Sequence, residues 1–221
     1  MSGPFSIRLD AMGFPMIRHE SWSYHIGLFP VSKYQFEHFM SELGPRGELY
    51  TDKWYRGLLE FNPHRSWRRC GEKPWQLFVT GVDYGGIAPF LRFLGKGFRL
   101  PTVEEWRALY NVSDELAKRK EDVLNACKRF SRPPLALPAR LWIERGLFPL
   151  VNEGVLEMVM GAHEVTCIGR PFDDFHHNCW DPTEVRPSNR SASQPLRIVG
   201  FRTVCRFDSA DQEINLLDVG M

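Results

Sequence analysis

The sequence predicts a single domain that mixes short β-strands with amphipathic helices. Three observations support this: a length of 221 residues, alternating apolar residues near the N-terminus, and two helix-start signals of the capping-box type. A chain of this length can bury one large core without disulfides or metals. We therefore treat residues 1–221 as one domain.

The N-terminal part of the chain carries the strand signals. Phe5, Ile7 and Leu9 alternate with polar neighbours, and residues 24–29 form a second short apolar run. Side chains of a strand point alternately to its two faces, so the first pattern is typical of a strand with one buried face. We expect short strands at both places.

Two capping boxes mark helix starts. Ser32 with Gln35, and Thr102 with Glu105, each precede an apolar stripe at helical spacing. In a capping box the hydroxyl accepts a hydrogen bond from the amide three residues on, and the longer side chain accepts one from the cap's own amide. A helix is therefore predicted after each pair, the second directly behind a short strand over residues 98–100.

Two further helices are expected between and behind these. Residues 78–95 begin as a strand and end as a short helix, with Pro89 in its first turn, where the missing N–H breaks no hydrogen bond. Residues 113–130 have Ser113 as a cap, acidic residues in the first turn and an apolar face, which predicts one helix. With the Pro133-Pro134 linker behind it, this helix forms a helical insertion over residues 113–140.

Composition excludes some partners. The 28 basic and 27 acidic residues give a net charge of +1, which produces no field for steering nucleic acid. No apolar run is long enough for a membrane span, and the N-terminus lacks the pattern of an export signal. Five scattered cysteines are typical of reduced thiols rather than of a secreted disulfide framework. We expect a cytoplasmic protein with no nucleic-acid or membrane partner.

Four blocks of the sequence resemble the signature segments of one family. Residues 95–106 (GKGFRLPTVEEW) are similar to GK-x-[FY]-RLPTEAEWE, and residues 30–40 (PVSKYQFEHFM) to EVT-N-x-x-Y-x-x-F. Residues 146–158 (GLFPLVNEGVLEM) are similar to GLYDMHGNVWEW, and residues 199–204 (VGFRTV) to the terminal GFRLV strand. In this order they resemble the formylglycine-generating-enzyme family, also called the sulfatase-modifying-factor family. The resemblance implies an α+β fold, a variant of the C-type-lectin fold with small twisted antiparallel sheets, two or three helices and much irregular loop.

The resemblance implies only half of a copper site. Oxidases of this family convert a substrate cysteine to formylglycine with Cu(I), held by two cysteines five residues apart behind a GGS-[YFW] block. Residues 169–172 match that block, and the two cysteine positions then fall on Asp174 and Cys179. A carboxylate is a poor ligand for Cu(I), so we expect no catalytic residues. A copper-dependent oxidase with Cys179 as a ligand is the alternative.

The resemblance also implies a calcium site. Its ligands in the family are carbonyls, a side-chain oxygen and the glutamate of the GNVWEW motif, and hard oxygen ligands suit this ion. Glu157 takes the glutamate position and Val155 a carbonyl position, while Leu150 stands where the side-chain oxygen is expected. Asn152 can compensate through a shifted turn. Two interpretations stay open: a calcium ion held by Glu157, Asn152 and Val155, and a purely structural loop.

A zinc site is a further alternative. The spacing of His163, Cys167, His176 and Cys179 permits four ligands. Members of the family do not generally carry such a site. We favour surface histidines and no bound cofactor.

Two loops, residues 65–69 and 170–180, predict a protein-binding surface, since Trp, Tyr and Arg are the residue types that anchor interfaces. We predict a non-catalytic adaptor that binds another protein. Such domains often serve in bacterial regulatory or defence systems, and a ligand-binding receptor of the lectin fold is a further alternative. The candidate residues are Arg65, Trp67, Arg68, Arg170, Phe172, Asp173, Asp174, Phe175, His176, His177 and Trp180.

Residues 208–221 form a C-terminal extension beyond the terminal strand. Ile214, Leu216, Leu217 and Val219 make it too apolar for a tail that is only solvated. Packing back as an edge strand is favoured over docking on a partner.

Overall fold

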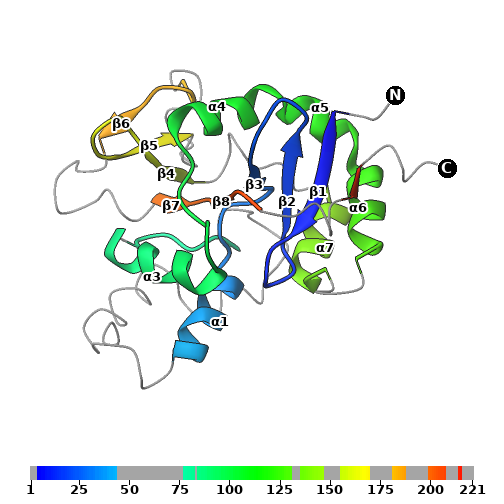
Figure 1. The fold of residues 1–221 in the computed structure, drawn as a ribbon, viewed down its shortest axis with the longest axis horizontal. Coiled ribbons are helices and arrows are strands. Elements are labelled where there is room, and N and C mark those ends of the chain that lie inside the picture. Colours follow the sequence, from blue (N-terminus) through cyan, green and yellow to red (C-terminus); the bar gives the residue numbers. More distant parts are fainter. Residues whose placement is uncertain are drawn as a thin grey trace.

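Two small sheets and six helices make up the described part of the protein, an α+β architecture (Figure 1). The computed structural model describes residues 4–43, 77–82, 84–130, 135–146, 155–169, 181–187, 199–207 and 214–215. The strands are β1 (Phe5–Leu9), β2 (Pro15–His19), β3 (His25–Gly27), β4 (Leu156–Met160), β5 (Val165–Gly169), β6 (Arg186–Pro187), β7 (Val199–Phe201), β8 (Val204–Cys205) and β9 (Ile214–Asn215). The helices are α1 (Lys33–Leu43), α3 (Tyr84–Leu94), α4 (Val103–Asn111), α5 (Ser113–Lys118), α6 (Lys120–Lys128) and α7 (Leu137–Glu144).

The two sheets are built around different parts of the chain. The five-stranded sheet has the order β8-β3-β2-β1-β9, and the four-stranded sheet has the order β6-β5-β4-β7. In Figure 1, α5, α6 and α7 lie beside β1 on one side of the molecule, and α1 and α3 lie together on the other. The alternation at Phe5, Ile7 and Leu9 therefore marks a real strand, and the prediction of strands near both N-terminal sites is confirmed.

Strand β4 of the four-stranded sheet is buried on both faces. Val155 and Val159 contribute to a core cluster shared with the five-stranded sheet and α4 to α7, whereas Leu156 and Met158 contribute to a second cluster with α1 and α3. Alternate residues of β4 thus enter two cores, which explains its nearly continuous apolar sequence. The pair β4–β7 is parallel, so the expectation of purely antiparallel sheets is wrong at this place.

The segment Val199–Cys205 belongs to both sheets. It was predicted as one terminal strand, but β7 pairs with β4 while β8 pairs with β3, and Arg202 and Thr203 lie between them. Arg202 is fully buried at this crossing. The Arg202 guanidinium binds Glu157 of β4 and the carbonyl of Gly27 at the end of β3, and so connects the two sheets.

Both predicted capping boxes are present. Thr102 Oγ1 accepts from the Glu105 amide at 3.2 Å, and a Glu105 carboxylate oxygen accepts from the Thr102 amide at 2.8 Å. Ser32 and Gln35 make the equivalent pair at 3.1 and 2.9 Å. Each pair satisfies amides that a helix start leaves without partners.

The buried carboxylate of Asp10 links the Ser32–Gln35 capping box to the five-stranded sheet. One Asp10 oxygen accepts from the amides of Met12 and Phe14, both at 2.8 Å, and the other accepts from Gln35 Nε2 at 3.2 Å. Burial raises the pKa of Asp10 to about 6, against the lowering effect of these three hydrogen bonds. The network fixes the β1–β2 turn to the start of α1.

The helical part of the chain differs from the prediction in number and position. The described residues hold six helices rather than two or three. Pro89 lies inside α3, beyond its first turn, because the helix already begins at Tyr84. The proline there removes the bond to the carbonyl four residues earlier, at Gly85. The strand expected over residues 98–100 is reduced to a single bridge between Arg99 and Val204.

The predicted helix over residues 113–130 is two helices. Arg119 leaves helical geometry with φ −102° and ψ 27°, and this bend separates α5, which contacts α4, from α6, which contacts β1. Ser113 is not the N-cap of α5, because α5 follows directly on α4. Its hydroxyl donates a hydrogen bond to the Tyr110 carbonyl instead. Helix α7 was not predicted as a separate element; its Pro138 lies in the first turn, where proline is tolerated.

The described part of the C-terminal extension, residues 214–215, packs as the predicted edge strand, while Leu216, Leu217 and Val219 lie outside the described residues. Ile214 and Asn215 form β9, an antiparallel edge strand beside Ile7 and Ser6 of β1. Ile214 also contacts the first core cluster. Among the helices of the described ranges, none combines the length and the apolar run that crossing a bilayer requires.

Candidate functional site

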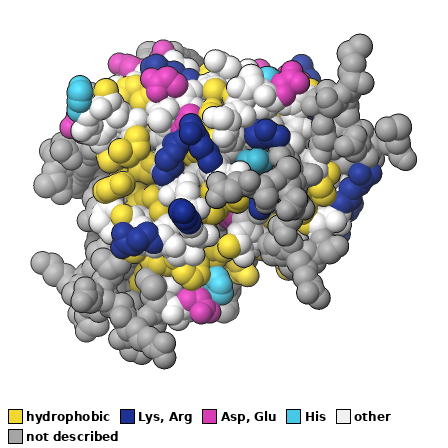
Figure 2. Space-filling model, in the orientation of Figure 1, with side chains coloured by type: hydrophobic (Ala, Val, Ile, Leu, Met, Phe, Trp, Pro, Cys, Tyr) yellow, Lys and Arg dark blue, Asp and Glu magenta, His cyan; other side chains and the backbone are white. Residues whose placement is uncertain are grey.

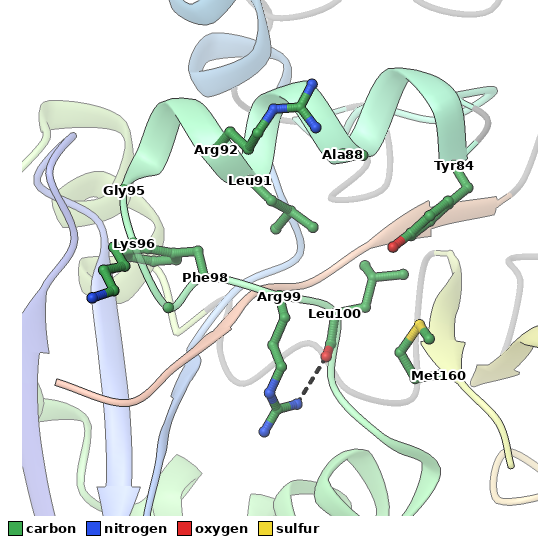
Figure 3. Close-up of a pocket in the computed structure, with 11 residues that line it drawn as sticks. Tyr84, Ala88, Leu91, Arg92, Gly95, Lys96, Phe98, Arg99, Leu100 and Met160 are labelled. Carbon is green, nitrogen blue, oxygen red and sulfur yellow. Dashed lines mark hydrogen bonds between the residues drawn. The ribbon is translucent and has the colours of Figure 1, made fainter.

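An open groove lies between α3 and the segment that links α3 to α4. Its volume is about 470 Å³, and its floor is formed by apolar side chains from three elements (Figure 3). Leu91 comes from α3, Leu100 from the linking segment and Met160 from the end of β4. Leu91 and Leu100 are anchored in the second core cluster, and Met160 packs against it, so the floor is a fixed surface.

One aromatic and two basic side chains border this floor. Tyr84, at the first turn of α3, is 46 % exposed, and its ring points toward Leu100 and Met160 in Figure 3. Arg92 and Lys96 lie at the other end of α3 and are exposed. Neither makes an ion pair or hydrogen bond with another residue of the described ranges. Figure 2 shows basic side chains gathered on this face beside apolar ones.

Arg99, the third basic residue of the groove, is committed to the fold. Its guanidinium donates to both Glu105 oxygens, at 2.6 and 2.5 Å, and to the Leu100 carbonyl at 2.9 Å. The hydrogen bond with Glu105 raises the pKa of Arg99. Burial raises the pKa of Glu105, but the bonds from Arg99 and the Thr102 amide outweigh it and the net pKa is lowered. Arg99 thus ties the groove wall to the capping box of α4.

Two glycines shape the turn that closes the groove. Gly95 and Gly97 have φ values of 127° and 92°, which side chains other than glycine rarely adopt. A Cβ at Gly97 would also lie 3.3 Å from the Arg206 carbonyl and 3.5 Å from Cys205 Sγ. The turn therefore sits directly on the end of β8.

The backbone of Leu100 faces away from β8. Arg99 and Val204 exchange two hydrogen bonds, of 2.9 and 2.8 Å, so the amides of Arg99's neighbours point to the opposite side. The Leu100 carbonyl accepts from Arg99, but its N–H makes no hydrogen bond to any part of the chain that the structure describes. Leu100 is only 1 % exposed, and unpaired amides in buried residues are rare.

A second polar arrangement lies between the two sheets. Arg202 Nε donates to one Glu157 oxygen at 2.8 Å and the terminal nitrogen Nη2 to the other at 2.9 Å, while Nη1 donates to the Gly27 carbonyl at 2.6 Å. Both partners are buried, Glu157 at 1 % exposure and Arg202 at 0 %. A calcium ion bound by Glu157 would have to displace Arg202, because both carboxylate oxygens accept from it. Val155 packs in the first core cluster, and Asn152 lies outside the described residues.

The thiols that the structure describes are buried. Burial raises the pKa of Cys127 to about 12 and that of Cys167 to about 11. Cys167 faces the second core cluster, whereas His163, its proposed zinc partner, is exposed. No group of three or more His, Cys, Asp or Glu side chains with metal-binding geometry occurs within the described ranges.

The predicted binding surface and the copper position lie outside the described residues. This applies to Arg65, Trp67 and Arg68 in the first loop, and to Arg170, Phe172, Asp173, Asp174, Phe175, His176, His177, Cys179 and Trp180 in the second.

Sequence reasoning missed the groove. Residues 95–100 fall inside the block that carries the family resemblance, and no binding residue was predicted there. One clue was available: Arg92 and Lys96 are four residues apart, next to an apolar helix face that ends in a glycine turn.

The comparisons with known proteins give no relative from which a function could be transferred. No protein-family model matches the chain, and neither does any curated protein or any solved structure.

Proposed function

We propose that this protein is a non-catalytic protein-binding module that acts as an adaptor. We further propose that its scaffold is the formylglycine-generating-enzyme variant of the C-type-lectin fold. The α+β architecture and the order of the four sequence blocks along it support the scaffold. The groove on the surface of the protein supports the protein-binding role.

The groove carries this proposal. It offers a tyrosine ring, an apolar floor and two exposed cations without partners among the described residues. These are the groups that anchor protein interfaces. The groove is open rather than enclosed, which suits a segment of a macromolecule better than a small reactant that must be shielded from water.

The charged residues of the resembling blocks support a structural role for those blocks. Arg99 pairs with Glu105, and Glu157 pairs with Arg202. In each pair the carboxylate accepts two hydrogen bonds from one guanidinium, which fixes both side chains. Groups held in this way stiffen a frame, and a stiff frame reduces the loss of conformational freedom when a partner binds.

Affinity capture with the tagged full-length chain from its own cells tests the adaptor role. We expect a partner retained at near-stoichiometric yield, and chemical cross-links from it to the groove or to the loops at 65–69 and 170–180. Trp67→Ala and Trp180→Ala, tested beside the wild type, report whether those loops contribute. Recovery of no protein above the tag control would contradict the proposal.

Copper titration separates the adaptor from the oxidase. The reduced protein is titrated with Cu(I) and then incubated with a cysteine peptide. If Cu(I) binds stoichiometrically, if Cys179→Ser abolishes this binding, and if the peptide gains formylglycine, the protein is an oxidase and the adaptor proposal is wrong. The affinity-capture experiment also tests an accessory role in a bacterial regulatory or defence system, because it identifies the partner.

A further inference from the structure

We infer that the groove between α3 and residues 95–100 binds an acidic segment of a partner protein that places one apolar side chain on the groove floor. This inference rests on the proposed adaptor function and names the chemistry of the segment that the adaptor recognises.

The floor selects an apolar side chain. Leu91, Leu100 and Met160 present only hydrocarbon and a thioether to the groove, and the exposed ring of Tyr84 borders them (Figure 3). A methionine and a tyrosine at the edge accommodate aliphatic or aromatic groups by small adjustments. A leucine or phenylalanine of the partner therefore gains most by covering this floor.

The rim selects acidic neighbours of that side chain. Arg92 lies in the last turn of α3 and Lys96 two residues beyond the end of this helix, and both are exposed and without partners in the described ranges. Arg99 adds a third cation but is neutralised by Glu105. The free positive charge of the groove is thus concentrated at one end, where carboxylates of the partner would be attracted.

Helix electrostatics alone would also place cations there. Basic residues near a helix C-terminus interact favourably with its dipole, so Arg92 and Lys96 have a structural explanation that needs no ligand. The experiment therefore needs a control that changes the same number of charges at the end of another helix. Lys128 and Arg129 at the end of α6 provide it, because both are exposed.

Fluorescence anisotropy with synthetic peptides tests the inference on the full-length protein. The probes are labelled peptides with one central leucine or phenylalanine flanked by Asp and Glu, and matched peptides flanked by Lys and Arg. We expect only the acidic peptides to bind, with affinity that falls as salt is raised. Arg92→Glu with Lys96→Glu should weaken binding about tenfold, whereas Lys128→Glu with Arg129→Glu should leave it unchanged.

A further variant separates the floor from the charge. Tyr84→Ala should weaken binding of the acidic peptide about tenfold while unfolding as the wild type does, because this residue is 46 % exposed.

Several outcomes overturn the inference. Equal binding of acidic and basic peptides, or equal effects of the two double charge reversals, would each do so. A change of oligomeric state in the groove variants would assign the groove to a second copy of this chain. If a captured partner cross-links only to the loops at 65–69 and 170–180, the adaptor function stands and this inference alone fails.

Discussion

The buried pair between Glu157 and Arg202 gives the sharpest prediction about stability. Both side chains are almost completely removed from water, and both carboxylate oxygens accept from one guanidinium. Glu157→Gln keeps the shape but leaves the charge of Arg202 uncompensated in the core, and turns one acceptor into a donor that faces another donor. Removing one partner of a buried pair typically destabilises a protein by about 3–5 kcal/mol.

A double variant separates the interaction energy of the Glu157–Arg202 pair from the contribution of each side chain alone. Glu157→Leu combined with Arg202→Met leaves no buried charge, and replacing both partners by apolar residues is often nearly neutral. Arg202 also satisfies the Gly27 carbonyl, so we expect a remaining loss of about 1–3 kcal/mol. The free energy of unfolding that the double variant loses should therefore be at least about 3 kcal/mol smaller than the summed losses of Glu157→Leu and Arg202→Met alone.

Urea unfolding followed by tryptophan fluorescence and far-ultraviolet circular dichroism measures these differences. The free energy of unfolding in water is compared for the wild type, Glu157→Gln, Glu157→Leu, Arg202→Met and the Glu157→Leu/Arg202→Met double variant. Losses below about 1 kcal/mol in each single variant, or additive losses in the double variant, would refute the reasoning, since both results are those of a solvated surface pair.

Three further predictions concern the stability of the fold. Thr102→Ala should lower the free energy of unfolding by about 1 kcal/mol in urea, because the Glu105 amide loses its cap, whereas Thr102→Ser should restore most of it. Gly97→Ala should lower the melting temperature by more than Gly146→Ala does, because a methyl group at Gly97 adds a close contact with the Arg206 carbonyl to the strain of a positive φ that both share. Burial raises the folded-state pKa of Asp10 from 3.8 to about 6, so its contribution to stability is fully present below about pH 4 and is lost as pH rises through about 6, on the order of 3 kcal/mol. In pH-dependent unfolding, Asp10→Asn should abolish this fall, so the stability difference between wild type and variant should change by about 3 kcal/mol between pH 4 and 6; a constant difference across that range would contradict it.

Local signals in the sequence predicted local structure well. Both capping boxes, the first strands and the edge strand at Ile214 follow from short-range patterns that no distant contact overrides. The same patterns could not show that residues 199–205 leave one sheet and enter another, because both halves are apolar and extended. That path depends on Arg202, whose partners lie 45 and 175 residues away.

The candidate site was harder to predict than the fold. The groove joins α3, a glycine turn and the end of β4, and the last of these is about 60 residues from the others in sequence. Its apolar floor has the same composition as the core beside it, so hydrophobic patterning does not distinguish them. Only the position of Arg92 and Lys96 marked the place, and charged helix ends are common.

The segment Val199–Cys205 also has a consequence for how the molecule folds. It completes the four-stranded sheet through β7 and the five-stranded sheet through β8, and β9 behind it pairs with β1 at the start of the chain. Neither sheet can close on a nascent chain until these late residues have been synthesised. Because such long-range pairing slows folding, we expect both sheets to form together, in one cooperative step after synthesis.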